Sequence, residues 1–219
     1  MQKKALFVAT SLAMGSPAYA LDLTYYGGAA LQQTTLEASL DFVPTTPSTG
    51  NSGDDTATEL RLFGGAITRA GSGFYGVEAA LEDGKAEETI KFSTFPSAGP
   101  GQRGQIQDGR SLSLSVIGGV DLLENARLYG RIGYIRTEFD FKTLSASSVE
   151  VDSKNKTFTD LQYAIGFDYF LSDRIAVRAE LSRTDYDDKA SLVGNVTGVL
   201  AEFDDISRDA LSIGIFTTF

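Results

Sequence analysis

The closing stretch of the chain, Leu211-Ser-Ile-Gly-Ile-Phe-Thr-Thr-Phe219, decides the fold. Its large apolar residues alternate with small or polar ones, which is the two-residue period of a β-strand with one apolar face. A soluble protein seldom ends in such a strand, because chain termini are usually polar and frayed. The last strand of a transmembrane barrel, by contrast, must be apolar on the side that faces lipid. We therefore expect the rest of the chain to carry the pattern of a barrel.

Seven further segments show the same two-residue period, so the sequence predicts an all-β fold of eight antiparallel strands. Long and short connections alternate between them, as in an up-and-down transmembrane β-barrel whose short turns face the periplasm and whose long loops face outward. All five prolines fall outside these strands, as expected because proline cannot donate to a strand ladder. The predicted strands cover residues 22–34, 58–69, 74–82, 110–122, 127–139, 158–170, 175–184 and 208–219.

One barrel domain is expected at residues 21–219, after a cleaved secretory signal at residues 1–20. The first twenty residues run from a lysine-bearing start through a short apolar segment to Ala18-Tyr-Ala20, the order that such signals share. The apolar segment is too short for a spanning helix, which needs about 20 residues. Four long surface loops are expected at about residues 41–57, 83–109, 140–157 and 185–207.

The charge and composition exclude several classes of function. The chain has 29 acidic and 19 basic residues, a net charge of −10, and neither cysteine nor histidine. This surface is a poor partner for nucleic acid, and disulfides or thiolate metal sites are impossible. Acidic runs at residues 185–188 and 202–205 could bind Ca²⁺, but they lack the spacing of a calcium loop, so solvated loop ends are the simpler interpretation. We expect no metal and no cofactor.

Alternate strand positions separate an apolar face from a charged one, and we expect the apolar face to meet lipid. Aromatic residues near the strand ends predict two girdles at the edges of the lipid band, although aromatics scattered by their preference for β-structure remain the alternative. The girdle at the turn end would contain Tyr25, Phe74, Tyr75, Tyr129, Tyr169, Phe170, Phe216 and Phe219. The girdle at the loop end would contain Phe139, Phe141, Phe158 and Tyr186.

Tight turns fix the register of neighbouring strands, and three of them set an acid opposite a base on the inner face. The predicted pairs are Arg61 with Glu82, Asp121 with Arg127, and Asp168 with Arg178. We interpret these pairs as parts of one polar network inside the barrel. Its predicted members are Asp168, Arg178, Arg131, Glu78, Glu180, Arg61, Glu82, Asp121 and Arg127.

The segment Gly166-Phe-Asp-Tyr-Phe-Leu-Ser-Asp-Arg-Ile-Ala-Val-Arg178-Ala-Glu-Leu resembles the penultimate hairpin of OmpA-like outer-membrane barrels, and Leu128-Tyr-Gly-Arg-Ile-Gly-Tyr resembles another strand of that family. The resemblance covers residues 21–219 and is most specific at 127–182. It implies an eight-stranded barrel of the OmpX or opacity type, without a peptidoglycan-binding domain. In that family an inner acid and an inner arginine of this hairpin belong to a buried ion network that blocks or gates the lumen. Asp168 and Arg178 fall on the matching positions.

The closing strand also resembles the signal that outer-membrane insertion machinery reads. Phe219 supplies the terminal aromatic, Gly214 the preceding glycine, and Ile213 and Ile215 the apolar alternation. Thr217 departs from the family, which often has an aromatic residue there. The resemblance thus implies three partners: outer-membrane lipid, lipopolysaccharide and the insertion machinery.

These observations favour a non-enzymatic, monomeric barrel in the outer membrane of a Gram-negative bacterium. Its role would be structural or at the surface, through envelope integrity, adhesion or recognition by the loops of an unidentified ligand. A small-solute channel is the alternative, since inner serines, glycines and alanines leave room in the lumen. A soluble periplasmic binding barrel is a third interpretation. A membrane-embedded enzyme is disfavoured because the chain has no histidine to act as a base.

Overall fold

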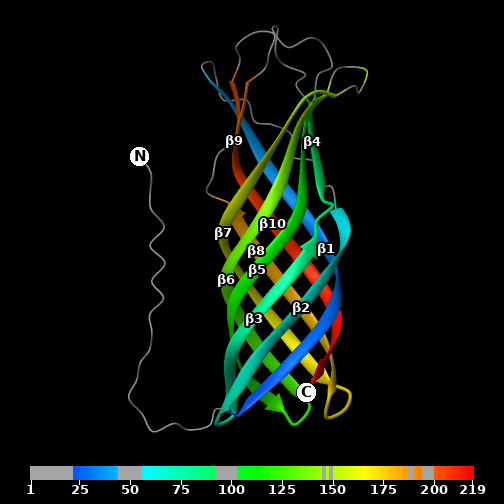
Figure 1. Cartoon of the computed structure of the whole chain (residues 1–219), viewed down its shortest axis with the longest axis vertical. Helices are drawn as coiled ribbons and strands as arrows, with labels where there is room; N and C mark the ends of the chain where they lie inside the picture. Colours follow the sequence, from blue (N-terminus) through cyan, green and yellow to red (C-terminus); the bar gives the residue numbers. More distant parts are fainter. Residues whose placement is uncertain are drawn as a thin grey trace, which may run out of the picture.

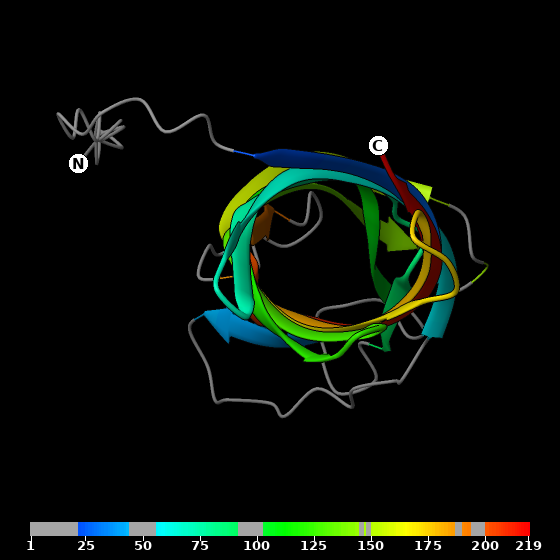
Figure 2. The ribbon, with the colours of Figure 1, turned by 90° about the horizontal axis from the view of Figure 1, so that it is seen from below.

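The computed structural model describes residues 22–43, 56–91, 103–144, 147, 150–186, 190–193 and 200–219. Its strands follow the order β1-β2-β3-β5-β6-β7-β8-β10, and pairing of β10 with β1 closes the sheet into a ring (Figures 1 and 2). The predicted closed, eight-stranded antiparallel barrel is therefore confirmed. Within the described residues no helix is long and apolar enough to cross a membrane. The strands are β1 (Leu23–Val43), β2 (Thr56–Ala70), β3 (Gly73–Asp83), β4 (Glu87–Lys91), β5 (Arg103–Leu123), β6 (Ala126–Leu144), β7 (Glu150–Phe170), β8 (Ile175–Tyr186), β9 (Ala190–Val193) and β10 (Leu200–Thr218).

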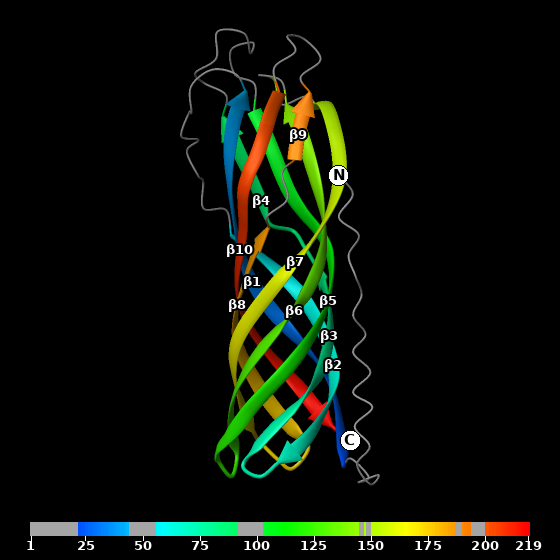
Figure 3. The same ribbon diagram turned by 90° about the vertical axis from the view of Figure 1, so that its left-hand side faces the viewer.

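Two short strands extend the barrel toward the loop end without adding a ninth position. β4 pairs with the part of β5 that lies beyond its contact with β3, and β9 pairs with the part of β10 that lies beyond its contact with β8. The link from β3 to β4 stays attached to β5, because the amide of Gly84 donates to the carbonyl of Gly109 at 3.1 Å. β4 and β9 thus continue the positions of β3 and β8 (Figure 3).

The strands run further than the sequence predicted. β4 and the first residues of β5 lie in the stretch 83–109 that was expected to be loop, the ends of β6 and β7 lie in 140–157, and β9 with the start of β10 lies in 185–207. The difference arises because the alternation of apolar residues ends where the outer face becomes polar, whereas the backbone hydrogen bonds between the strands extend further toward the loops. The described part of the chain does not include residues 1–20, most of 41–57, or residues 187 and 188 of the first acidic run.

The tight turns have the predicted register. Gly71 has a φ of 65°, a left-handed conformation that glycine adopts without strain, and Gly71 and Ser72 form the two-residue turn between β2 and β3. This turn sets Arg61 opposite Glu82. The next two set Asp121 opposite Arg127 and Asp168 opposite Arg178.

Partway along the strands toward the loops, the outer face changes from apolar to polar and the inner face changes from polar to apolar. β6 illustrates this change. Toward the turns its outward residues are apolar, with Ile132 48% and Tyr134 65% exposed, and its inward residue Arg131 is buried. Toward the loops Arg136 is outward and exposed, whereas Phe139 is inward and fully buried. The outward apolar side chains therefore form a band that ends near Tyr134 on this strand.

The predicted aromatic girdle at the loop end is wrong. Phe139, Phe141, Phe158 and Tyr186 are all buried inside the barrel, at 0–2% exposed. Each of the four lies an even number of residues from a buried charge on its own strand, and therefore on the inner face. The reference residues are Arg131 for Phe139 and Phe141, Asp168 for Phe158, and Arg178 for Tyr186. In the turn-end group Tyr25, Tyr75, Tyr169 and Phe219 are exposed outward, whereas Phe74, Tyr129 and Phe216 are buried and Phe170 is half-buried.

Candidate functional site

The interior of the barrel holds a network of buried charges. Eight strands enclose a lumen that side chains can just fill, so inward residues must pack against one another across it. Among the described residues, six carboxylates and four guanidinium groups are at most 4% exposed. They are Glu59, Glu78, Glu82, Asp108, Asp168 and Glu180, with Arg61, Arg131, Arg178 and Arg208.

The layer nearest the turns is centred on Arg178. Its Nε and Nη2 donate to the two oxygens of Asp168 at 2.8 and 3.0 Å, a bidentate pair, and its Nη1 donates to Glu78. Four aromatic rings surround the guanidinium group, with centroids 4.5–5.5 Å from its carbon. These rings belong to Tyr26, Phe63, Tyr129 and Phe216, and their cation–π contacts stabilise a charge that is removed from water.

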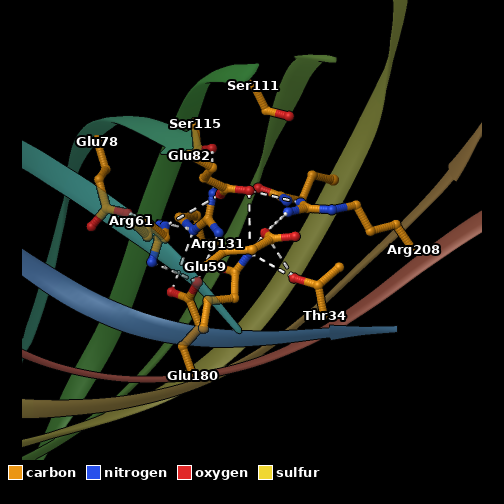
Figure 4. A network of polar contacts seen from close by, with 12 residues as sticks. Thr34, Glu59, Arg61, Glu78, Glu82, Ser111, Ser115, Arg131, Glu180 and Arg208 are labelled. Atoms are coloured by element: carbon orange, nitrogen blue, oxygen red, sulfur yellow. Dashed lines mark hydrogen bonds and ion pairs between the residues drawn. The ribbon is translucent and has the colours of Figure 1, made fainter. Parts of the chain in front are cut away.

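The middle layer joins two arginines through shared glutamates (Figure 4). Arg61 contacts Glu78 at 2.7 Å, Glu82 at 3.4 Å and Glu180 at 3.1 Å. Arg131 contacts the same Glu180 at 2.8 Å. Because Glu78 also contacts Arg178, it connects this layer to the one below.

Neutral polar side chains complete the middle layer. Nη1 of Arg131 donates to Ser115 at 3.0 Å and to Gln162 at 2.8 Å. The hydroxyl of Tyr129 donates to Glu180 at 2.6 Å. These bonds matter because a buried charge that loses its partners is strongly destabilising.

The layer nearest the loops is centred on Arg208, which lies beside Glu59 and Glu82 in Figure 4. Its nitrogens contact Glu59 at 2.8 Å, Glu82 at 2.7 Å and Asp108 at 3.1 Å. Thr34 donates to Glu59 at 2.9 Å. Glu82 contacts both Arg61 and Arg208, so the three layers form one continuous network.

A cluster of apolar side chains covers the network on its loop side. Two of its ring pairs pack edge to face, Phe139 with Tyr186 at 5.1 Å and 86° and Phe141 with Phe158 at 6.2 Å and 81°. The hydroxyl of Tyr186 bonds to Thr137, which in turn bonds to Ser111. The cluster consists of Leu36, Ala86, Ile106, Phe139, Phe141, Phe158, Tyr186 and Ile206.

On the turn side, rings and one further ion pair occupy the lumen. The guanidinium carbon of Arg127 lies 4.3 Å from the ring centroid of Phe170 and 5.3 Å from that of Phe74. Its Nε donates to Asp121 at 2.9 Å, and Asp121 also accepts from the exposed Arg69.

The structure brings seven of the nine predicted network residues together, and it places Asp121 and Arg127 as a separate pair at the turn end. Sequence reasoning missed Glu59, Asp108 and Arg208. Glu59 has the inward parity of Arg61, and Arg208 has that of Ser212. The two-residue period of the strands would therefore have predicted both as inward residues. Asp108 lies in a stretch that was expected to be loop, and no signal in the sequence marked it.

The predicted insertion residues lie at the closing seam between β10 and β1. Ile213, Ile215 and Phe219 point outward and are 53–73% exposed. Gly214 lies opposite Ala30, where a Cβ would meet Ala30 Cβ at 2.6 Å. Glycine thus permits the close approach of the two strands here, and the role of these residues in insertion stays a prediction.

The inner serines, glycines and alanines were expected to leave room in the lumen, but neighbouring side chains fill most of it. A Cβ on Gly166 would overlap the ring of Tyr129, and one on Gly119 would overlap that of Phe74, so these rings occupy the room that the glycines leave. A cavity of about 10 Å³ lies between Arg178, Asp168 and the rings at the turn end. No group of three or more acidic side chains in the described residues is arranged to hold a metal ion.

Solved structures with a similar fold are outer-membrane barrels. OprG from Pseudomonas aeruginosa matches with a TM-score of 0.60 at 16% identity, over 91% of this chain and 96% of its own. The protease OmpT from Escherichia coli matches with a TM-score of 0.50 at 10% identity, over 94% and 99%. Ail from Yersinia pestis matches with a TM-score of 0.44 at 12% identity, over 89% and 99%.

A comparison with curated protein sequences finds no match. The model of the outer membrane protein beta-barrel domain, however, matches residues 5–219, nearly the whole chain. The outward apolar band and the polar lumen are what an outer-membrane position requires. The protein therefore resides in the outer membrane of a Gram-negative bacterium, and the chain belongs to the outer membrane protein beta-barrel domain family.

Proposed function

We propose that the protein is a closed, non-enzymatic barrel that supports the envelope and presents its loops at the cell surface for adhesion or recognition. The observation that carries this proposal is the filled lumen. Three layers of ion pairs lie between apolar clusters at both ends, and the ten charged groups are at most 4% exposed. A solute would have to separate several buried ion pairs, each of which is costly to break.

The absence of histidine supports the non-enzymatic part of this proposal. The chain of 219 residues has neither histidine nor cysteine, so it lacks the imidazole base and the thiol nucleophile that barrel hydrolysis could use. OmpT is a protease by name, but at 10% identity its likeness to this chain extends to the fold alone.

A small-solute channel is the second candidate, and one feature favours it. Ser111, Ser113 and Ser115 form a row of small polar side chains along β5, and the buried hydroxyl of Ser113 has no hydrogen-bond partner among the described groups. A hydroxyl in that position could contact passing water.

Planar-bilayer recording distinguishes the two candidates. We expect the purified, full-length barrel to give no conductance steps, because buried ion pairs and packed rings fill its lumen. Gel mobility of boiled and unboiled samples shows beforehand that the barrel is folded. Regular steps from heat-modifiable protein would contradict a closed barrel and establish the channel.

A further inference from the structure

The buried charges that the described residues place in the lumen do not balance. Six are carboxylates and four are guanidinium groups, so the network has two surplus negative charges if every acid is ionised. All ten groups are at most 4% exposed. An uncompensated charge in such surroundings is strongly unfavourable, and a buried acid avoids it by holding a proton. The position of the surplus therefore indicates where a proton binds.

The surplus lies in the layer nearest the loops. In the other two layers three guanidinium groups contact three carboxylates, so those layers are balanced. These pairs are Arg178 with Asp168, Arg61 with Glu78, and Arg131 with Glu180. The layer nearest the loops has one guanidinium group, that of Arg208, and three carboxylates. These carboxylates belong to Glu59, Glu82 and Asp108.

Two of these three acids have the partners that an ionised carboxylate requires. Glu82 contacts two guanidinium groups, that of Arg208 at 2.7 Å and that of Arg61 at 3.4 Å. Glu59 accepts from four donors. They are Nη2 of Arg208 at 2.8 Å, the hydroxyl of Thr34 at 2.9 Å, Nε2 of Gln32 at 3.3 Å and the amide of Lys85 at 3.1 Å. Such contacts favour the charged form of an acid.

Asp108 has weaker support, with two donors among the described residues. The amide of Ala86 donates to Oδ1 at 2.6 Å, and Nε of Arg208 donates to Oδ2 at 3.1 Å, the longest of the three Arg208 contacts. Burial raises the pKa of Asp108 to about 7, although the charge of Arg208 lowers it. A neutral acid retains both contacts, because its carbonyl oxygen accepts from the amide and its hydroxyl oxygen keeps a lone pair for the guanidinium group.

Asp108 lies on the loop side of the outward apolar band. On β5 the band ends at Leu112, which is 53% exposed, and the next outward residue toward the loops is the exposed Arg110. Asp108 pairs with Phe139, a member of the apolar cluster at the loop end. A proton that binds to Asp108 is therefore exchanged with the external medium.

The groups around this layer do not compensate the surplus. Tyr186 on β8 is neutral, because burial raises its pKa to about 12. Lys85 and Asp83, in the link from β3 and at its end, contact each other at 3.5 Å and are 58–59% exposed. The inward charges on β7 are the exposed Lys154 and the half-buried Lys156 and Asp160. The inward side chains of β1 and β6 at this height are uncharged, and they are Thr34, Leu36, Thr137, Phe139 and Phe141.

We propose that the layer nearest the loops is a proton-binding site, in which Asp108 remains a neutral carboxylic acid up to neutral pH. One surplus charge then remains, on Glu59, where four donors stabilise it. Release of the proton adds a second surplus charge beside Arg208. Asp108 also joins the link between β3 and β4 to β5, since its amide donates to the carbonyl of Ala86 at 2.9 Å. The site thus makes the loop end of the barrel more stable in a more acidic medium.

The sign of this effect follows from the two states of the chain. In the unfolded chain Asp108 ionises near its ordinary pKa of 3.8, whereas in the folded barrel it ionises near 7. Between these values the folded protein binds one proton more than the unfolded chain. The contribution of Asp108 to stability therefore decreases as the pH rises through this window, and it is constant above the window.

Asp108→Asn tests the proposal, because it replaces a neutral acid by a neutral amide of the same shape. Asp168→Asn is the matched control, the same change at another buried acid that an arginine holds. Urea unfolding in lipid vesicles at about pH 5 and 8 compares both variants with the parent. From the lower to the higher pH the unfolding constant of the parent should rise at least about tenfold relative to Asp108→Asn, since one proton changes it about tenfold per pH unit. At the higher pH Asp108→Asn should be as stable as the parent or more stable, whereas Asp168→Asn should be less stable.

Infrared spectroscopy detects the proton directly, because the carbonyl stretch of a neutral carboxylic acid lies apart from the bands of carboxylates and amides. The folded, full-length barrel is measured in a detergent without carbonyl groups. We expect a neutral-acid band at about pH 6 that disappears toward about pH 9. The band should be absent in Asp108→Asn and present in Asp168→Asn and Glu59→Gln.

Four results would overturn the proposal. The first is the absence of a neutral-acid band in the folded parent at the lower pH. The second is a band that persists in Asp108→Asn and is lost in Glu59→Gln, which would place the proton on Glu59. The third is a loss of stability in Asp108→Asn at the higher pH as large as that in Asp168→Asn, which would show that Asp108 acts there as an ionised partner of Arg208. Failure of Asp108→Asn to fold at the higher pH, as judged by heat-modifiable mobility, would lead to the same conclusion.

Discussion

Replacement of Arg178 by methionine tests whether the buried network stabilises the barrel. The substitution leaves Asp168 without the bidentate partner that holds both of its oxygens. Glu78 is affected less, because Arg61 at 2.7 Å and the hydroxyl of Tyr26 at 2.8 Å still contact it. We therefore expect the cost to come mainly from one unpaired carboxylate, about 3–5 kcal/mol, with a further ~0.5–2 kcal/mol from the lost ring contacts.

The double variant makes this prediction specific. Asp168→Asn alone should cost less than Arg178→Met, since Arg178 keeps Glu78 and its four rings. Combining the two substitutions should be less damaging than Arg178→Met alone, because no unpaired charge then remains at position 168. Such non-additivity is expected for residues in direct contact.

Urea unfolding in lipid vesicles measures these differences. Heat-modifiable gel mobility reports the folded fraction, and the nine tyrosines provide a fluorescence signal without interference from tryptophan. Arg183→Met is the control, since its ion pairs are about half exposed and should contribute at most ~1 kcal/mol. The reasoning is refuted if Arg178→Met lies within about 1 kcal/mol of the parent, since a broken buried pair costs several times that, or if the double variant is as unstable as the sum of the singles.

Three further substitutions test other parts of the barrel by the same unfolding assay. Gly166→Ala should destabilise by about 1–3 kcal/mol because its Cβ overlaps Tyr129; the outward Gly130→Ala, whose Cβ has its nearest neighbour at 3.8 Å, should be tolerated, and equal effects would contradict the packing. Phe139→Ala should cost about 3–5 kcal/mol through the cavity it leaves, with Phe139→Leu milder, so a neutral Phe139→Ala would show that the loop-end cluster is not a core. Ile213→Arg, at an outward position 60% exposed, should cost ~2–4 kcal/mol and Thr217→Arg near the turn end only ~0–1 kcal/mol; a reversed order would mean that the apolar band is misplaced.

The sequence was sufficient for the strand order and for the inner pairs on strands that a tight turn connects. A two-residue turn fixes which residues face each other, so Arg61 and Glu82 could be paired by counting alone. Links between distant strands could not be found that way. Arg208 contacts Glu59 and Asp108 across the lumen, and only closure of the barrel brings these three strands together.

The aromatic residues at the loop end were misplaced for a physical reason that the structure makes explicit. On β7 the outward residues change from Leu161 to Thr159 at the same height at which the inward residues change from Asp160 to Phe158. Below that height the outer face meets lipid, so the apolar side chains point out. Above it the outer face meets water. Apolar side chains are therefore more stable when they point into the barrel and are buried there, as in a soluble protein. An aromatic residue near a strand end therefore belongs to a girdle or to a core according to its parity, and the strand position at which hydrophobic parity inverts marks the edge of the membrane.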